Sequence, residues 1–237
     1  MENFKIFESN KSIFKGIACI VTLFFLGLTD ILYLPLYIFN IKLSIGLSEA
    51  YNILTKFVAI VVVIYMFKNE LETAFDKFKK NAANYLKKYI KYWYLAYGLM
   101  VLSNILISPF IRVAKNEQGV QAIIESSPVF AIFAIALFGP IIEELMFRFS
   151  LRKIIKNDWF YIIISGTLFG AMHIIGVAKI WQDWLFIIPY SIPGMVFAYV
   201  YVKSKNIFMP IMLHIIHNSF LTMLPILLMI LNFFANL

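Results

Sequence analysis

The sequence has few charged residues and a single cysteine. Only 14% of its 237 residues are Asp, Glu, Lys or Arg, whereas 62% are hydrophobic. A soluble domain usually has about a quarter charged and about half apolar residues. The composition therefore excludes an ordinary soluble domain and indicates a membrane protein. The lone Cys19 lies inside an apolar run, so no intramolecular disulfide can form, and a packing residue is expected there rather than a nucleophile.

Acidic residues are fewer than basic ones, 13 against 21, which gives a formal net charge of +8. Because the basic residues lie between apolar runs, we interpret them as signals for orientation in the membrane, and no nucleic-acid partner is expected. The lysines near the N-terminus and those within 68–91 predict that both termini are cytoplasmic. The abundance of Ile, Phe, Lys and Asn is typical of an AT-rich genome and hints at a bacterium. Together with the apolar runs, we expect a multi-pass protein of a bacterial cell membrane.

The apolar runs predict an all-α fold with about eight transmembrane helices. Residues 68–88 carry apolar side chains at helical spacing between lysines and acids, which predicts an amphipathic helix on the inner leaflet. The predicted spans are 16–39, 49–67, 89–111, 129–150, 160–178, 184–202, 207–218 and 219–236.

Two adjacent glutamates stand inside the fourth predicted span, where ionisable groups are costly and indicate function. Glu144 and Arg148 are four residues apart, so they share a helix face and are expected to pair. Glu143 is turned about 100° away and has no such partner on its own helix. This arrangement predicts a structural role for Glu144 and leaves Glu143 free to face a cavity as a general base.

All three histidines of the chain lie in two other predicted spans. Phe169 and His173 share a face of the fifth span. His214 and Asn218 share a face of the seventh, and both can donate hydrogen bonds to a developing oxyanion. His217 lies beside them and is interpreted as a packing or supporting residue.

The residues that other classes of intramembrane protease need for hydrolysis are absent from the sequence. The zinc-protease pattern H-E-x-x-H is absent, no serine stands in a G-x-S-x-G context, and only one of the four aspartates, Asp30, lies well inside a span. The remaining route is water activated by Glu143, with His173 as a second acid/base group. A metal site stays open as an alternative, because Glu143, His173 and His214 could supply three ligands to zinc.

Three motifs carry a resemblance to a known family. They are Glu143-Glu144-x-x-x-Arg148, Phe169-x-x-x-His173 and His214-x-x-x-Asn218. In this order and on separate spans, they resemble the CPBP family, which comprises CAAX prenyl endopeptidases and bacteriocin-processing or abortive-infection membrane proteins. The resemblance covers residues from about 125 to 220.

The resemblance implies helices around a membrane-embedded cavity and a metal-independent, glutamate-dependent intramembrane peptidase with no cofactor. By likeness, Glu143 activates water, His173 assists proton transfer, and His214 and Asn218 hold the oxyanion. Glu144, Arg148 and Phe169 are supporting residues. The substrate does not follow from the resemblance, because a CAAX protease cuts after a prenylated cysteine and bacteria generally lack this modification. We expect a membrane-associated peptide or protein as substrate, with a role in bacteriocin immunity or peptide processing.

The chain is expected to form a single membrane domain over 1–237. Its parts are 1–128 with the N-terminal spans and the interfacial helix, 129–220 with the catalytic helices, and 221–237 with the last span. The alternative function is a non-proteolytic immunity or regulatory scaffold that keeps the family fold. A proton-coupled transporter is less favoured, because no inverted repeat is visible.

Overall fold

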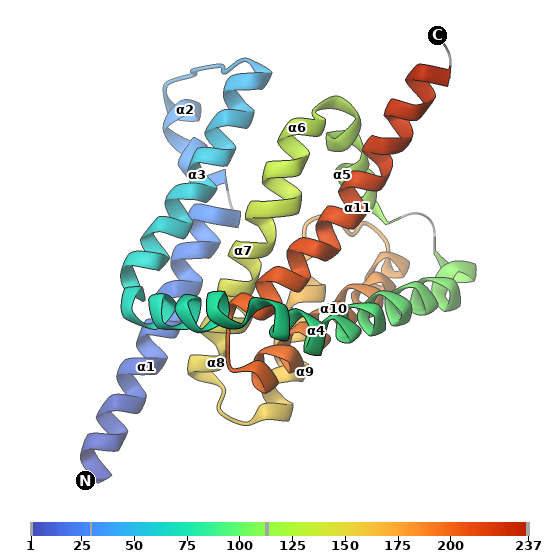
Figure 1. Cartoon of the computed structure of the whole chain (residues 1–237). Helices are drawn as coiled ribbons and strands as arrows, with labels where there is room; N and C mark the ends of the chain where they lie inside the picture. Colours follow the sequence, from blue (N-terminus) through green and yellow to red (C-terminus); the bar gives the residue numbers. More distant parts are fainter. Residues whose placement is uncertain (1, 29, 112–113, 236–237) are drawn as a thin grey trace.

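Helices make up every regular element that the computed structural model describes, which covers residues 2–28, 30–111 and 114–235 (Figure 1). The predicted all-α fold of a polytopic membrane protein is confirmed. In chain order the elements are α1 (Glu2–Leu23), η1 (Phe24–Leu28), η2 (Asp30–Tyr33), α2 (Leu34–Ile38), α3 (Ile45–Met66), α4 (Lys68–Ile107), η3 (Ser108–Phe110), α5 (Lys115–Ser126), α6 (Pro128–Ala131), η4 (Ile132–Phe138), α7 (Gly139–Glu144), η5 (Leu145–Ser150), α8 (Leu151–Ile154), α9 (Asp158–Met172), η6 (Trp181–Phe186), α10 (Ile187–Ser204) and α11 (Phe208–Ala235).

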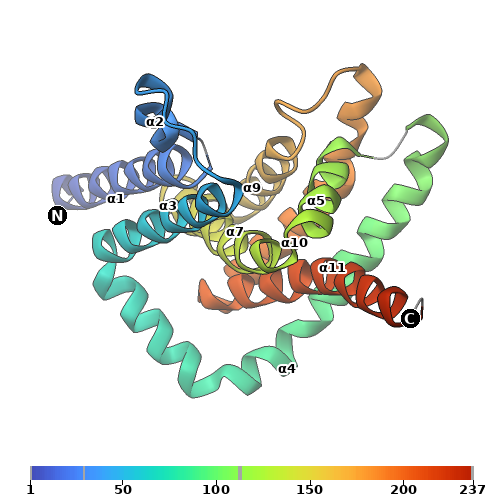
Figure 2. The ribbon, with the colours of Figure 1, turned by 90° about the horizontal axis from the view of Figure 1, so that it is seen from above.

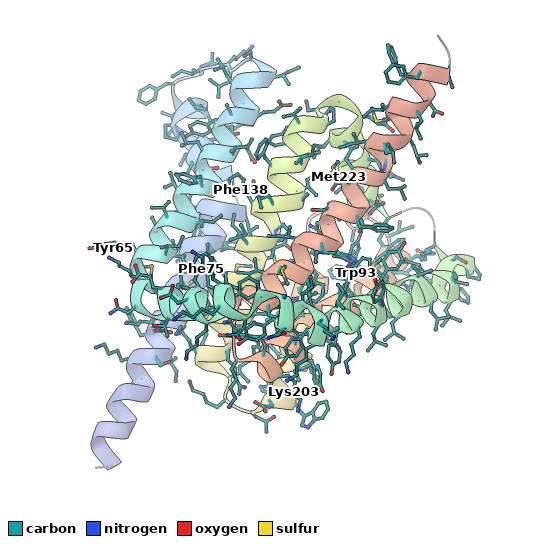
Figure 3. The ribbon with its side chains drawn as sticks, viewed as in Figure 1. Tyr65, Phe75, Trp93, Phe138, Lys203 and Met223 are labelled. Carbon is teal, nitrogen blue, oxygen red and sulfur yellow. The ribbon has the colours of Figure 1, made fainter. Side chains whose placement is uncertain are left out.

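Six helical segments among the described residues are long and apolar enough to cross a membrane. A further apolar helix, α9, has 15 residues. Many large hydrophobic side chains of these segments are exposed, as contact with lipid requires, and Tyr65 and Met223 are among them (Figure 3). The six segments are Asn10–Leu28, Ile45–Met66, Lys68–Phe110, Pro128–Ile154, Trp181–Ser204 and Phe208–Ala235.

The predicted count of about eight spans is approximate, because the runs 207–218 and 219–236 form one continuous helix, α11. Its polar residues His214 and His217 are buried against the rest of the protein, so they do not end the helix. Pro225 is also accommodated inside α11. Prolines are tolerated in membrane helices because neighbouring groups satisfy the freed backbone positions.

The predicted interfacial helix and the third predicted span are also continuous and form the 40-residue helix α4. A kink at Asn81, which has φ −128° and ψ 16°, separates the two parts. The side-chain amide of Asn81 donates to the carbonyl of Lys77 at 3.1 Å, and such competition with the backbone bends helices. In Figure 2, α4 bends around the outside of the bundle from α3 past α11. Its placement on the inner leaflet stays a prediction.

Two other features of the structure do not follow from the predicted spans. The fifth span was expected to continue to residue 178, but α9 ends at Met172, and the turn that follows contains Gly176 at φ 88°. The segment between the third and fourth predicted spans contains the 12-residue helix α5, for which the apolar runs give no prediction.

The centre of the bundle is the helical segment from α6 to α8, which includes the π-helical stretches η4 and η5 (Figure 1). All six residues of η5 are buried, as expected for a helix surrounded by others. On one side α9 packs closely on α10, because Gly166 and Gly170 let the two backbones approach. A Cβ atom on Gly166 would lie 2.6 Å from the backbone nitrogen of Met195, so even alanine requires a shift there. The absence of a side chain at both glycines therefore permits the close approach of α9 and α10.

The side of the membrane on which each terminus lies stays a prediction. In Figure 1 the beginning of α1 and the end of α11 lie at opposite ends of the molecule. Residues 1, 236 and 237 lie outside the described residues.

Candidate active site

A buried ion pair between Glu144 and Arg148 forms the base of the site. Glu144 Oε2 lies 3.2 Å from Arg148 Nε, and both side chains are fully buried. Arg148 Nη2 also donates to the carbonyl of Gly194 on α10 at 3.1 Å. The predicted pairing of Glu144 with Arg148 is confirmed, and the contact with Gly194 joins this pair to α10.

His214 connects the ion pair to the second glutamate. Its Nδ1 lies 2.8 Å from Glu144 Oε1, a hydrogen bond between α11 and α7. Because a carboxylate paired with arginine can only accept, His214 Nδ1–H is the donor, and Glu144 fixes the tautomer and orientation of the ring. The opposite nitrogen, Nε2, lies 3.6 Å from Glu143 Oε2.

Glu143 faces the cavity beside this imidazole. Its side chain is 19% exposed, and its Oε2 atom is buried without a hydrogen-bond partner among the described residues. The distance of 3.6 Å to His214 Nε2 is too long for a hydrogen bond. A buried carboxylate oxygen without a donor has the capacity to accept a proton or a hydrogen bond from water.

His173 follows the last residue of α9 and is held by its own helix. Its Nδ1 lies 2.9 Å from the carbonyl oxygen of Phe169, so Nδ1–H donates and Nε2 remains available. The ring stacks on Tyr190 of α10, with centroids 4.8 Å apart and an interplanar angle of 18°. These two contacts orient the imidazole.

Asn218 lies one turn beyond His214 on α11. Its Nδ2 donates one hydrogen bond to the carbonyl of Ile135 at 3.0 Å, which fixes the side-chain amide. An amide nitrogen carries two hydrogens, so the second one is available to another acceptor.

Phe169 packs in the middle of these groups and is itself buried. Its ring lies 4.6 Å from the guanidinium carbon of Arg148 and 4.7 Å from the imidazole of His173. It also makes an edge contact with His214, with centroids 5.5 Å apart. Phe169, which was predicted as a supporting residue, thus contacts three other residues of the site.

A single cavity of about 870 Å³ receives Glu143, His173, His214 and Asn218. The structure thus brings all four predicted catalytic side chains, from α7, α9 with its cap, and α11, to one cavity. His217 lines the same cavity and is buried between the rings of Tyr97 and Phe197.

Tyr190 and Lys56 are two of the cavity residues that were not identified from the sequence. Tyr190 stacks on His173, and its hydroxyl accepts a hydrogen bond from Asn116 at 3.3 Å. Lys56 of α3 lines the cavity and donates to Asn52 at 2.6 Å. A lysine in the middle of an apolar span is a functional signal, and it could have identified Lys56. Tyr190 between two prolines in an apolar span gave a weaker signal.

Glu143, His173 and His214, the alternative zinc ligands, all line this cavity, but their side chains do not meet at one point. Among the described residues, no group of three or more His, Cys, Asp or Glu side chains is arranged to hold a metal ion. His214 also uses Nδ1 for Glu144, which leaves only Nε2 as a possible ligand atom. The residues present therefore do not form a ready-made metal site, and the expected independence from cofactors stays a prediction.

Comparisons with known proteins agree with the motifs. Residues 125–220 match the family model described as type II CAAX prenyl endopeptidase Rce1-like. The chain is 30% identical over 122 residues to the "Putative membrane peptidase YdiL" of Bacillus subtilis (strain 168), covering 48% of this chain and 45% of that protein. It is 26% identical over 162 residues to the "Membrane-embedded CAAX protease MroQ" of Staphylococcus aureus (strain USA300), covering 60% of each chain.

The matches cover about half the length of these relatives. No solved structure matches the chain significantly. The resemblance to the CPBP family of CAAX-type membrane proteases is confirmed, and the matched segment coincides with the one that carries the three motifs.

Proposed function

We propose that this CAAX-protease-like membrane protein is an intramembrane endopeptidase that cleaves a membrane-associated peptide or protein by means of a glutamate-activated water. The observation that carries the proposal is the position of Glu143. Its partly exposed side chain lines a large cavity, and its unpartnered Oε2 atom lies 3.6 Å from an imidazole that a second carboxylate orients. These are the components that addition of water to a peptide bond requires.

In the first step, Glu143 accepts a proton from a water molecule in the cavity while the water oxygen attacks the substrate carbonyl. A carboxylate that lines the cavity, is partly exposed and has no donor committed to its Oε2 atom is suited to this role. The carbonyl oxygen becomes an oxyanion, and the proton taken from water is held on the carboxyl group.

The oxyanion is stabilised by His214 and Asn218. A proton on His214 Nε2 donates to the oxyanion, while Nδ1–H donates to the Glu144 carboxylate, which holds the ring in place. The second amide hydrogen of Asn218 supplies another donor, because the first is used by Ile135. Both donors are held by protein contacts before substrate arrives, which avoids a reorganisation cost during the reaction.

In the last step, the tetrahedral intermediate collapses, the C–N bond breaks, and the leaving amine takes a proton. His173 assists this transfer through Nε2, since its Nδ1 is committed to the Phe169 carbonyl. The proton that arrives at the amine derives from the attacking water by way of Glu143. The residues therefore return to their starting protonation states.

The substrate is a peptide or the membrane-proximal end of a protein. A cavity of about 870 Å³ is within the range of sites for sizeable ligands. A prenylated cysteine is a less suitable recognition group in a bacterium, where this modification is generally lacking. Bacteriocin immunity or peptide processing is the physiological role that we propose.

Cleavage by the purified protein tests the proposed function. The protein in phospholipid vesicles is incubated with a pool of membrane-anchored peptides, and the products are identified by mass spectrometry. We expect two complementary fragments from at least one peptide, in amounts that increase with protein concentration. If no fragment forms, while cells that carry His173→Ala keep the phenotype of the wild type, the scaffold function is correct and the peptidase proposal is wrong.

A further inference from the structure

A second pocket, of about 160 Å³, lies between α4 and α10 and shares no lining residue with the cavity of Glu143. Its lining consists of lysines and tyrosines alone. The six residues are Lys88, Tyr89, Lys91, Tyr92, Tyr199 and Lys203, and we call them the Lys–Tyr pocket.

Three ammonium groups share this pocket, and no carboxylate lines it. Lys88, Lys91 and Lys203 form no ion pair with a described residue, whereas Lys68, Lys115, Arg152 and Lys153 each have a carboxylate partner. Like charges gathered without a counter-charge repel one another, so an anion in the pocket would lower the energy of this arrangement.

The tyrosines hold the lysines and add hydrogen-bond donors. Each ammonium lies over a tyrosine ring, at 5.3 Å for Lys88 over Tyr89, 5.3 Å for Lys91 over Tyr92, and 5.5 Å for Lys203 over Tyr199. The rings of Tyr92 and Tyr199 are 5.4 Å apart and join α4 to α10. None of the three hydroxyls makes a hydrogen bond within the part of the chain that the structure describes, so they are available to a ligand.

The Lys–Tyr pocket lies where both helices change from apolar to charged. In α4 the lysine-rich segment ends at Lys91, and exposed apolar residues such as Leu95 and Leu99 follow it. In α10 the apolar segment ends at Lys203, which lies below α4 in the view of Figure 3. Lysine and tyrosine together at such a boundary are typical of the depth of lipid headgroups.

We propose that the Lys–Tyr pocket binds the phosphate of an anionic phospholipid headgroup. Lysine ammoniums and tyrosine hydroxyls both donate to phosphate oxygens. A volume of about 160 Å³ equals that of roughly five waters, which suits the five heavy atoms of a phosphate group. Basic pockets between membrane helices on the cytoplasmic side bind lipid headgroups of this charge. The bound lipid would fasten α4 to α10.

Lipid binding to the full-length protein in detergent micelles tests this proposal. Native mass spectrometry measures the affinity for phosphatidylglycerol, for phosphatidylcholine with the same acyl chains, and for inorganic phosphate. The pocket variant carries Lys88→Gln, Lys91→Gln and Lys203→Gln. The matched control variant carries Lys79→Gln, Lys80→Gln and Lys87→Gln, which removes the same charge from exposed positions of α4 outside the pocket.

We expect the wild type and the control variant to bind one phosphatidylglycerol per chain. The pocket variant is expected to bind this lipid roughly 100-fold more weakly. Each lysine near an anionic headgroup increases the binding constant about fivefold, and the variant lacks three lysines. Phosphatidylcholine is expected to bind all three proteins weakly and equally. An equal loss of phosphatidylglycerol affinity in the pocket and control variants would refute the proposal that the Lys–Tyr pocket is the binding site. Displacement of the lipid by millimolar inorganic phosphate would show that free phosphate is the ligand and would overturn the lipid assignment.

Discussion

Replacing Glu143 by glutamine is expected to lower kcat/KM for peptide cleavage about 1000-fold, within the range usually lost with a general base. Glutamine keeps the size of the side chain but cannot accept a proton from water. The effect is expected in kcat rather than KM, since the water is activated only during the reaction. The measurement is a progress curve of fragment formation with the wild type and the variant at several substrate concentrations.

Glu117→Gln is the matched control, because Glu117 lines the same cavity on α5 and accepts a hydrogen bond from Gln121. The control is expected to stay within about threefold of the wild type, because Glu117 has no role in the proposed chemistry. Both variants should unfold at the same temperature as the wild type, since the Glu143 Oε2 atom has no hydrogen bond to lose among the described residues. If Glu143→Gln cleaves the peptide as fast as the wild type, Glu143 is not the general base and the proposed mechanism is wrong.

Replacing Arg148 by methionine is expected to reduce the free energy of unfolding by about 3–5 kcal/mol, because it leaves the buried Glu144 carboxylate without its counter-charge. The variant also loses the hydrogen bond to Gly194 and the contact with the Phe169 ring. Denaturant unfolding in mixed micelles measures the change. The matched control is Arg152→Met, whose half-exposed pair with Asp158 is expected to contribute only about 0–1 kcal/mol.

The double variant Glu144→Gln with Arg148→Met separates charge from packing. It removes both buried charges, so it is expected to recover more than half of the lost free energy. It should still cleave poorly, because the neutral amide at 144 accepts a weaker hydrogen bond from His214 Nδ1–H than a carboxylate does and holds the ring less firmly. Equal stability of Arg148→Met and Arg152→Met would contradict the structural role assigned to the buried pair.

The sequence predicted contacts within one helix better than contacts between helices. The spacing of Glu144 and Arg148 on one helix was enough to predict their pair. The hydrogen bond from His214 to Glu144 joins residues 70 positions apart, and helical periodicity contains no information on it. The stacking of His173 on Tyr190 is likewise a tertiary contact between two helices. The residues that meet in the cavity could be identified from the sequence, whereas the contacts between helices that orient them could not.

Helix boundaries were missed where polar or small residues have a role in the fold. The polar residues around His214 looked like the end of a span, but they face the cavity and α11 continues through them. The apolar residues after His173 looked like a continuation of α9, but the chain turns there and contains Gly176 at positive φ. Hydropathy measures the polarity of a segment and not the direction in which its side chains point.

The measurement that tests the central claim most directly is cleavage by protein from which metal has been removed. The claim is that Glu143 activates water by itself, beside His214. Protein dialysed against a chelator is assayed with a cleaved peptide, and its metal content is measured in the same sample. The account predicts a rate within about twofold of the untreated protein, with far less than one metal ion per chain. A rate that falls after metal removal and returns with one equivalent of zinc would contradict it.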